Sequence, residues 1–277
     1  TITLLCDEPA HSRMALPYWL AGTIPEAHTH TGDAASFARL QVATRFGVRV
    51  AAVDPRGKTV TLADGGKLDF DKLLIATGSS PLAPSIPGAD LPGVEPLWSL
   101  AHTERVLKYA ASLQPAGRTP RVVLVGAGFI GFIVLNAMFK RKWQLAVVER
   151  EGQVLPRMLD APAAEHVRRW LATRAIPVHC GATVQRIRQD ADGAKAVELS
   201  DGRSLTADIV ILATGIRPNL DLVQGSGITI GEAILVNDRM QTKFPYVYAG
   251  GDVAQGPVLH ETQSAVHPIQ PTAVDHG

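Results

Sequence analysis

Six consecutive residues near the middle of the chain constrain its fold more than any other feature: Gly126-Ala127-Gly128-Phe129-Ile130-Gly131. They follow an apolar strand pattern at 122–125 and open a helical pattern that runs to residue 140. Glycines at this spacing in this context indicate a dinucleotide-binding turn. Gly126 permits the tight turn, Gly128 lets the backbone approach a pyrophosphate, and Gly131 allows close packing of helix on strand. We expect the amides of Phe129 and Ile130 to meet the phosphate charge; a glycine-rich turn without a ligand is the alternative.

A carboxylate ends the next predicted strand, at 145–149. Glu149 follows the glycines at about the 20-residue distance where an acidic side chain accepts both hydroxyls of an adenosine ribose. The same carboxylate repels a 2′-phosphate, so we expect NAD rather than NADP. Arg150 keeps NADP open as the alternative, because its side chain can turn toward a phosphate.

Strands and helices alternate along the chain as in a parallel, doubly wound sheet, and the pattern occurs twice. The first occurrence comprises a strand at 1–6, a helix at 34–46, short strands within 48–76 and Thr77-Gly78. The second comprises strands at 122–125, 145–149 and 209–213, helices at 128–140 and 162–174, meander strands at 178–188, 196–199 and 204–206, and Thr214-Gly215. We predict an α/β fold with two three-layer, Rossmann-like dinucleotide-binding domains that combine parallel sheets with β-meanders.

The Pro- and Gly-rich stretch at 81–96 reads as a crossover between the domains, and a helix follows at 101–113. We expect a first domain that starts at 1–98, a second domain at 99–228 and a return to the first domain at 229–277. The first strand ends at Asp7 and Glu8 without a glycine motif before it. We therefore expect the first domain to be discontinuous and to lack its phosphate-binding strand and helix; Asp7 and Glu8 as solvated turn residues are the alternative.

Charge and cysteine content exclude several classes of protein. Lys and Arg total 27 against 26 Asp and Glu, so no basic surface for nucleic acid is indicated. Two cysteines, Cys6 and Cys180, lack Cys-x-x-Cys spacing, which argues against a disulfide scaffold or a zinc site and favours the cytoplasm. The uncharged run at 122–139 contains three glycines and Asn136 and is interpreted as strand plus helix, not a membrane span. No signal peptide and no metal site are predicted, and small molecules or another protein are the expected partners.

Several segments together resemble a known family over nearly the whole chain. They are Ile2-Thr3-Leu4-Leu5-Cys6-Asp7-Glu8, Ser12-Arg13-Met14-Ala15-Leu16-Pro17-Tyr18, Leu74-Ile75-Ala76-Thr77-Gly78-Ser79, the central glycine motif, Ile211-Leu212-Ala213-Thr214-Gly215-Ile216-Arg217-Pro218-Asn219 and Val247-Tyr248-Ala249-Gly250-Gly251-Asp252-Val253. With them the sequence resembles the FAD-dependent pyridine nucleotide-disulfide oxidoreductases, which include ferredoxin reductases, NADH oxidases and the flavin part of assimilatory nitrite reductases.

The resemblance implies FAD binding in the first domain and NAD(H) binding in the second. Asp252 would hydrogen-bond the ribityl chain of FAD, and Ala213, Thr214 and Gly215 would close the nicotinamide nucleotide domain. The remaining FAD-site residues would be Asp7, Glu8, Arg13, Ala76, Thr77, Gly78 and Gly251. The segment 267–273 resembles the start of a helix whose amides face the flavin. His260 and His267 are candidate proton donors or, alternatively, solvated or packed side chains, and no catalytic residue is assigned.

The sequence also departs from the family. Met14 stands where some members carry a redox cysteine, and a thioether forms neither a thiolate nor a disulfide. Ile133 stands where many members carry a glutamate near the nicotinamide. We expect the chain to lack the C-terminal interface domain of many relatives, as a fragment, a processed form or a short family variant. The resemblance implies a flavoprotein that passes electrons from NADH through FAD to a partner protein or small acceptor without a redox disulfide, with a homodimer as a compatible assembly. The alternative is a non-catalytic nucleotide-binding or regulatory subunit.

Overall fold

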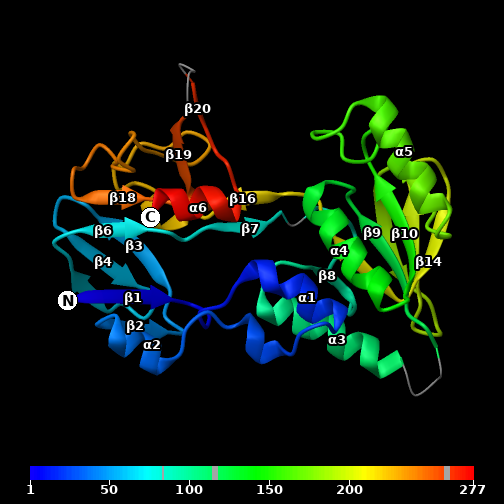
Figure 1. Cartoon of the computed structure of the whole chain (residues 1–277), viewed down its shortest axis with the longest axis horizontal. Helices are drawn as coiled ribbons and strands as arrows, with labels where there is room; N and C mark the ends of the chain where they lie inside the picture. Colours follow the sequence, from blue (N-terminus) through cyan, green and yellow to red (C-terminus); the bar gives the residue numbers. More distant parts are fainter. Residues whose placement is uncertain (83, 114–117, 259–262) are drawn as a thin grey trace. The chain divides into compact units, whose positions relative to one another are not determined.

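The computed structural model describes residues 1–82, 84–113, 118–258 and 263–277, so His260 lies outside the described residues. The chain forms two compact units, and Figure 1 shows the elements of each. The first unit contains residues 1–10, 30–80 and 216–277, whereas the second contains residues 11–29 and 81–215. Each unit is therefore assembled from segments that lie far apart in the sequence.

These boundaries differ from the predicted ones at 98/99 and 228/229, and the packing explains why. Strand β8 (Val94–Pro96) pairs with β15 (Ile209–Leu212) in the sheet of the second unit. Leu20 of helix α1 (Leu16–Ala21) is buried in the core of that same unit. Leu222, by contrast, belongs to the core of the first unit. Short segments thus join the unit that buries their apolar side chains.

The second unit is built on a parallel sheet of five strands in the order β11-β10-β9-β15-β8. The first three strands in this order are β11 (Val178–Cys180), β10 (Gln144–Glu149) and β9 (Arg121–Val125). Helices α3 (Leu100–Leu113), α4 (Phe129–Lys140) and α5 (Ala161–Ala172) accompany it. The single meander strand predicted at 178–188 is wrong: β11 pairs in register with β10, and only residues from Val184 onward enter the meander.

Alternate residues of β9 enter two different cores. Val122 and Leu124 pack with α3 and α4 residues such as Val106, whereas Val123 and Val125 pack with the antiparallel meander. The meander consists of β12 (Val184–Gln189), β13 (Lys195–Leu199) and β14 (Ser204–Ala207). Because successive side chains of a strand point to opposite faces, an uninterrupted apolar run suits a strand covered on both sides. The predicted three-layer α/β arrangement with a parallel sheet and a meander is confirmed.

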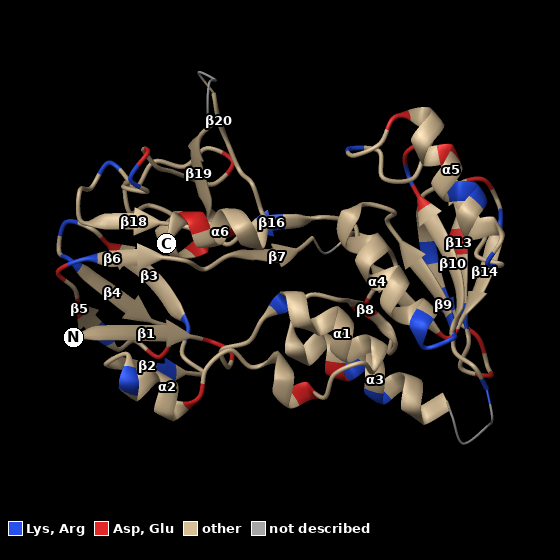
Figure 2. Cartoon of the chain, in the orientation of Figure 1, with Lys and Arg blue, Asp and Glu red and all other residues tan. Residues whose placement is uncertain are grey.

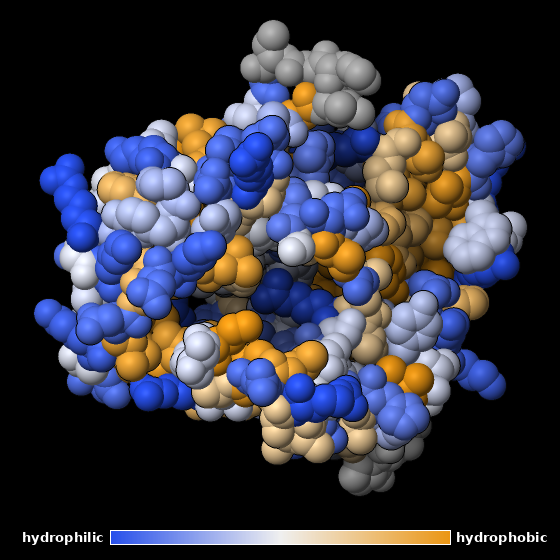
Figure 3. All heavy atoms as spheres, turned by 60° about the vertical axis from the view of Figure 1, so that its left-hand side comes forward, coloured by the Kyte–Doolittle hydropathy of each residue, from blue (hydrophilic) through white to orange (hydrophobic). Residues whose placement is uncertain are grey.

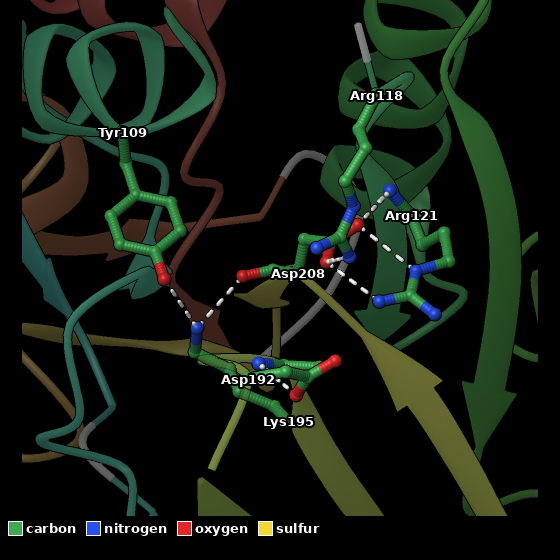
Figure 4. Close-up of polar contacts among 7 residues, drawn as sticks. Tyr109, Arg118, Arg121, Asp192, Lys195 and Asp208 are labelled. Atoms are coloured by element: carbon green, nitrogen blue, oxygen red, sulfur yellow. Dashed lines mark hydrogen bonds and ion pairs between the residues drawn. The ribbon is translucent and has the colours of Figure 1, made fainter. Parts of the chain in front are cut away.

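A buried polar cluster ties the meander to the rest of the second unit (Figure 4). Lys195 is fully buried, and its Nζ donates hydrogen bonds to the Tyr109 hydroxyl at 3.0 Å and to the Asp208 carbonyl at 2.7 Å. The Asp208 carboxylate accepts hydrogen bonds from the guanidinium groups of Arg118 and Arg121. These contacts satisfy polar groups that would be costly to bury unpaired.

Parallel strand pairs form two of the small sheets in the first unit. One is β1 (Ile2–Cys6) with β2 (Val42–Phe46), and the other is β6 (Leu73–Ile75) with β18 (Val247–Ala249). The other elements of the unit are α2 (Ala34–Arg39), β3 (Val50–Asp54), β4 (Thr59–Leu62), β5 (Lys67–Asp69), β16 (Ile216–Pro218), which pairs with β7 (Ser79–Pro81), β17 (Ile234–Leu235), β19 (Ala254–Pro257), β20 (Ser264–Ala265) and α6 (Gln270–His276). Strands β17 and β19 also pair in parallel. Ile75, Val247 and Val53 meet in one core, so the parallel pair β6–β18 and the antiparallel strands share a hydrophobic interior.

The single helix predicted at 34–46 is wrong, because it is a helix followed by a strand. Asp33 caps α2 by accepting a hydrogen bond from the Ser36 amide at 2.8 Å, and the helix ends at Arg39. Gln41 has a φ of 54°, which breaks the helical path. Val42 onward pairs in parallel with β1, a pairing that a single-sequence helical pattern does not reveal.

The surface carries mixed charge and some apolar side chains. Figure 2 shows basic and acidic residues distributed over the elements of both units. On the first unit, Ile2, Leu4 and Phe46 of the β1–β2 pair remain 64%, 37% and 40% exposed, and Figure 3 shows apolar patches among polar ones on this side. Within the described ranges, no helix has the length and apolar character needed to cross a membrane.

Candidate functional site

The glycine turn lies between β9 and α4, and two of its glycines are required by packing. A Cβ on Gly126 would lie 2.3 Å from the Ala213 carbonyl oxygen, and the φ of Gly126 is +104°. A Cβ on Gly131 would lie 2.3 Å from the Gly126 carbonyl oxygen. A Cβ on Gly128 would meet nothing within 4 Å. Gly126 and Gly131 therefore serve the fold, whereas Gly128 leaves open space beside the backbone.

That open space lies at the start of α4. Gly128 is the N-cap residue, and no side chain caps the helix. Phe129 and Ile130 form its first turn and are 48% and 39% exposed. The first amides of a helix lack partners within the helix and carry the positive end of its dipole. The residues present thus fit a pyrophosphate, which needs close backbone approach and amide donors.

Glu149 ends β10 next to this turn, and only 8% of it is exposed. Its Oε2 accepts a hydrogen bond from the Ala127 amide at 2.6 Å, and its Oε1 accepts one from the Glu151 amide at 2.9 Å. The carboxylate therefore holds the glycine turn against the end of β10. A carboxylate has about four acceptor positions, so two remain for ribose hydroxyls. The predicted ribose contact itself stays a prediction.

The surroundings of Arg150 do not favour binding of a nucleotide 2′-phosphate. Its side chain is 75% exposed, and its Nη2 lies 3.0 Å from Oε1 of Glu151. The negative charge of Glu151 opposes the attraction that Arg150 would exert on a 2′-phosphate.

The second Ala-Thr-Gly segment lies beside the glycine turn. The Ala213 amide donates to the Val125 carbonyl at 2.8 Å, and the Ala213 carbonyl faces Gly126. Gly215 has a φ of +116°, and its carbonyl accepts from the Leu82 amide at 2.9 Å. The structure thus brings Gly126, Gly131, Glu149 and Ala213 together at the carboxyl ends of parallel strands, where open α/β sheets bind ligands.

A second group of predicted residues converges in the first unit. The Asp252 Oδ2 accepts a hydrogen bond from the Ser79 hydroxyl at 2.6 Å, and Ser79 is 1% exposed. Thr77 donates to the Asn219 carbonyl at 3.1 Å, and the Asn219 side chain donates to the Thr77 carbonyl at 2.8 Å. Gly251 has a φ of +71°. The first Ala-Thr-Gly segment and the Gly-Gly-Asp segment are therefore neighbours.

Two of these residues were not predicted as site residues. Ser79 and Asn219 belong to motifs that carry the family resemblance, but nothing in their local sequence reveals their contacts. Ala76 and Thr77 are both exposed. Placement of FAD against this group stays a prediction.

The other predicted FAD residues lie in different surroundings. Asp7 follows β1, is 59% exposed and lies 3.7 Å from Arg49, and Glu8 follows it in the same unit. Arg13 belongs to the second unit, where its guanidinium stacks over the Trp98 ring at 4.8 Å. The segment 267–273 includes the start of α6, which begins at Gln270 without a side-chain cap.

Cysteine chemistry is not supported by the geometry. Cys6 and Cys180, the two cysteines of the chain, are both free thiols. Burial raises the pKa of Cys180, and the nearby Glu149 carboxylate raises it further. A raised pKa keeps the thiol protonated and unreactive at neutral pH. Met14 is 48% exposed and offers only a thioether.

Comparisons with known proteins agree with these features. Residues 2–270 match the family described as pyridine nucleotide-disulphide oxidoreductase. The chain is 32% identical to the epsilon subunit of NADH-dependent phenylglyoxylate dehydrogenase from Aromatoleum evansii, with 96% of this chain and 62% of that protein covered. It is 33% identical to NADH oxidase from Methanocaldococcus jannaschii, with 98% and 60% covered.

A solved structure shows the same architecture. The NAD-dependent persulfide reductase from A. fulgidus superposes with a TM-score of 0.90 at 28% identity, over 100% of this chain and 53% of that protein. The chain thus spans about 60% of the length of these two curated relatives. By the match of residues 2–270, the chain belongs to the pyridine nucleotide-disulphide oxidoreductase family.

Proposed function

We propose that the chain is part of a flavoprotein oxidoreductase that transfers hydride from NADH to FAD and passes electrons to a partner protein or small acceptor. The observation that carries this proposal is the glycine turn, in which Gly128 leaves open space beside uncapped helix amides and Glu149 holds the turn in place. Bound FAD would supply the hydride acceptor and the electron-transfer chemistry. The protein supplies position and electrostatics.

Each unit contributes one cofactor site in this proposal. In the second unit, the amides of Phe129 and Ile130 hold the NADH pyrophosphate, and Glu149 accepts hydrogen bonds from the ribose. In the first unit, Thr77 and Gly78 line the flavin, and the Asp252 carboxylate binds its ribityl chain. The carboxylate of Glu149 and the ion pair of Arg150 with Glu151 both support NAD over NADP.

Family membership and the relatives' names support the same assignment. NADH-dependent phenylglyoxylate dehydrogenase, NADH oxidase and NAD-dependent persulfide reductase are all named for NAD or NADH. The free cysteines and Met14 support electron transfer that does not pass through a disulfide of this chain. The cytoplasmic location and a homodimeric assembly stay predictions.

Anaerobic mixing with NADH tests the proposal. Protein expressed from the full gene and reconstituted with FAD should lose its visible flavin absorption when NADH is added, because the bound flavin is reduced. An unchanged spectrum, measured with a flavin content that confirms loading, contradicts the proposal.

A second candidate function is a nucleotide-binding subunit without turnover. Ile133, on α4, departs from the glutamate that the family resemblance implies near the nicotinamide, and one relative is itself named as a subunit. Calorimetry that detects NADH binding by the full-gene product, together with no retained flavin, would favour this candidate.

A further inference from the structure

Asn219 forms a dense set of hydrogen bonds with the first Ala-Thr-Gly segment. Its amide donates to the Gly78 carbonyl at 2.9 Å, and its Nδ2 donates to the Thr77 carbonyl at 2.8 Å. Its Oδ1 accepts from the Ser80 hydroxyl at 2.8 Å, and its carbonyl accepts from the Thr77 hydroxyl at 3.1 Å. One residue therefore holds residues 77–80 through both its backbone and its side chain.

The held segment contains the hydrogen-bond donor for Asp252. Ser79 lies between Gly78 and Ser80, is 1% exposed, and donates to Asp252 at 2.6 Å. Asn219 directly follows β16, which pairs with β7, so its own backbone is placed by a strand. A shift of residues 77–80 would move the Ser79 hydroxyl relative to the Asp252 carboxylate. Asn219 is thereby connected to Asp252 through one short segment.

We propose that Asn219 is a positioning residue for the flavin site: it sets the path of residues 77–80 and, through Ser79, the orientation of the Asp252 carboxylate. This inference rests on the proposed function, because it assigns the site to FAD. Asn219 itself need not touch the cofactor. A short polar side chain that merely joined two loops would affect stability alone, whereas a positioning residue affects the affinity and the environment of the flavin.

The chemistry of the amide group explains why asparagine stands here. The side chain donates through Nδ2 and accepts through Oδ1 at the same time. An ionised aspartate only accepts, so Asn219→Asp would place a carboxylate oxygen against the Thr77 carbonyl. Asn219→Ala removes both side-chain bonds and leaves the two backbone bonds in place.

A matched control is available in the same unit. The Asn237 Oδ1 accepts from the amides of Arg239 and Gln241, and its Nδ2 donates to the Gln241 side chain at 3.3 Å. Asn237 thus makes a comparable set of side-chain bonds, all within its own turn. Asn237→Ala reports what the loss of such bonds does to the fold of the unit without changing residues 77–80.

The experiment measures FAD affinity by fluorescence titration of the apoprotein expressed from the full gene. Loss of two hydrogen bonds predicts that Asn219→Ala weakens FAD binding by about tenfold or more. Asn219→Asp should weaken it at least as much, and Asn237→Ala should leave it within about twofold of wild type. At saturating FAD, the visible circular dichroism of the flavin should change in the Asn219 variants only.

Ser80→Ala provides a milder test in case the Asn219 variants do not fold. It removes only the hydrogen bond from the Ser80 hydroxyl to Oδ1 of Asn219 and should weaken FAD binding by about fivefold. Wild-type affinity and an unaltered flavin spectrum in the folded variants would overturn the inference while the proposed function stands. Equal weakening by Asn237→Ala would also overturn it. Failure of the wild-type protein to bind FAD would instead overturn the proposed function, and the inference with it.

Discussion

Replacement of two glycines in the same turn should separate folding from nucleotide binding. In Gly131→Ala, the new Cβ would lie 2.3 Å from the Gly126 carbonyl oxygen, where ordinary contacts are 3.4–4 Å. In Gly128→Ser, the new Cβ would meet no protein atom within 4 Å. The first substitution therefore collides with the fold, and the second occupies only the space that we assign to the pyrophosphate.

The expected magnitudes follow from these distances. Relief of the Gly131→Ala overlap requires a shift of about 1 Å in the backbone of a buried turn, and overpacking that moves the backbone costs about 2–3 kcal/mol, the upper part of the usual range. Alanine is favoured over glycine in a helix by about 1 kcal/mol, which offsets part of that cost. A net loss of about 1–2 kcal/mol predicts a fall in Tm of about 2–8 °C. Serine is a good N-cap residue, so Gly128→Ser should change the free energy of unfolding by less than about 0.5 kcal/mol.

Thermal unfolding without nucleotide and NADH calorimetry together make the test. Gly128→Ser should keep the wild-type Tm and bind NADH about tenfold more weakly or worse, because its side chain fills the phosphate position. Gly131→Ala should lower both Tm and affinity, since the Gly126 carbonyl must move. Wild-type NADH affinity in Gly128→Ser would refute the assignment of the open space, and an unchanged Tm in Gly131→Ala would refute the packing argument.

Three further outcomes are expected. Glu149→Ala should weaken NADH binding, because the turn loses its acceptor and the ribose loses its partner; an unaltered Kd in calorimetry would remove the ribose assignment. Replacement of Met14 by leucine should preserve turnover with an artificial electron acceptor, and an inactive but flavin-loaded enzyme would show that the thioether matters to the flavin. Burial acts to raise the pKa of Asp208, but the hydrogen bonds and charge of Arg121 outweigh it and lower that pKa. A folded-state pKa below the ordinary aspartate value stabilises the fold at pH values above that ordinary value. This stabilisation is lost as the pH falls through the folded-state pKa. Asp208→Asn should therefore lower the free energy of unfolding by about 2 kcal/mol at pH 7. In chemical unfolding, the difference in this free energy between the variant and wild type should shrink below about pH 4, and a difference independent of pH would contradict this reasoning.

Local patterns in the sequence were sufficient for the centre of the second unit. The apolar runs at 122–125 and 209–213 predicted buried parallel strands, because a strand covered on both faces needs apolar residues at every position. The spacing of Gly126, Gly128 and Gly131 predicted the turn between β9 and α4, since tight turning and close packing depend on residues only a few positions apart. Glu149 was likewise expected at the end of the adjacent strand, where it lies.

Local sequence patterns did not predict the contacts between residues that lie far apart in the sequence. Residues 42–46 became a strand because β1 offered a parallel partner, and residues 178–180 joined the parallel sheet because β10 did. The unit boundaries likewise depend on which core buries β8, Leu20 and Leu222.

The same reason applies to the polar contacts of the two sites. These hydrogen bonds join positions that lie far apart in the sequence. The separation is 22 residues for the bond from the Ala127 amide to Glu149, 173 for the Ser79–Asp252 bond and about 140 for the bonds of Asn219 to residues 77–80. The order of residues along the chain was enough to show which residue types stand at strand ends and in the glycine turn. Which of these residues meet depends on the folded chain, because hydrogen bonds and buried contacts form between neighbours in space.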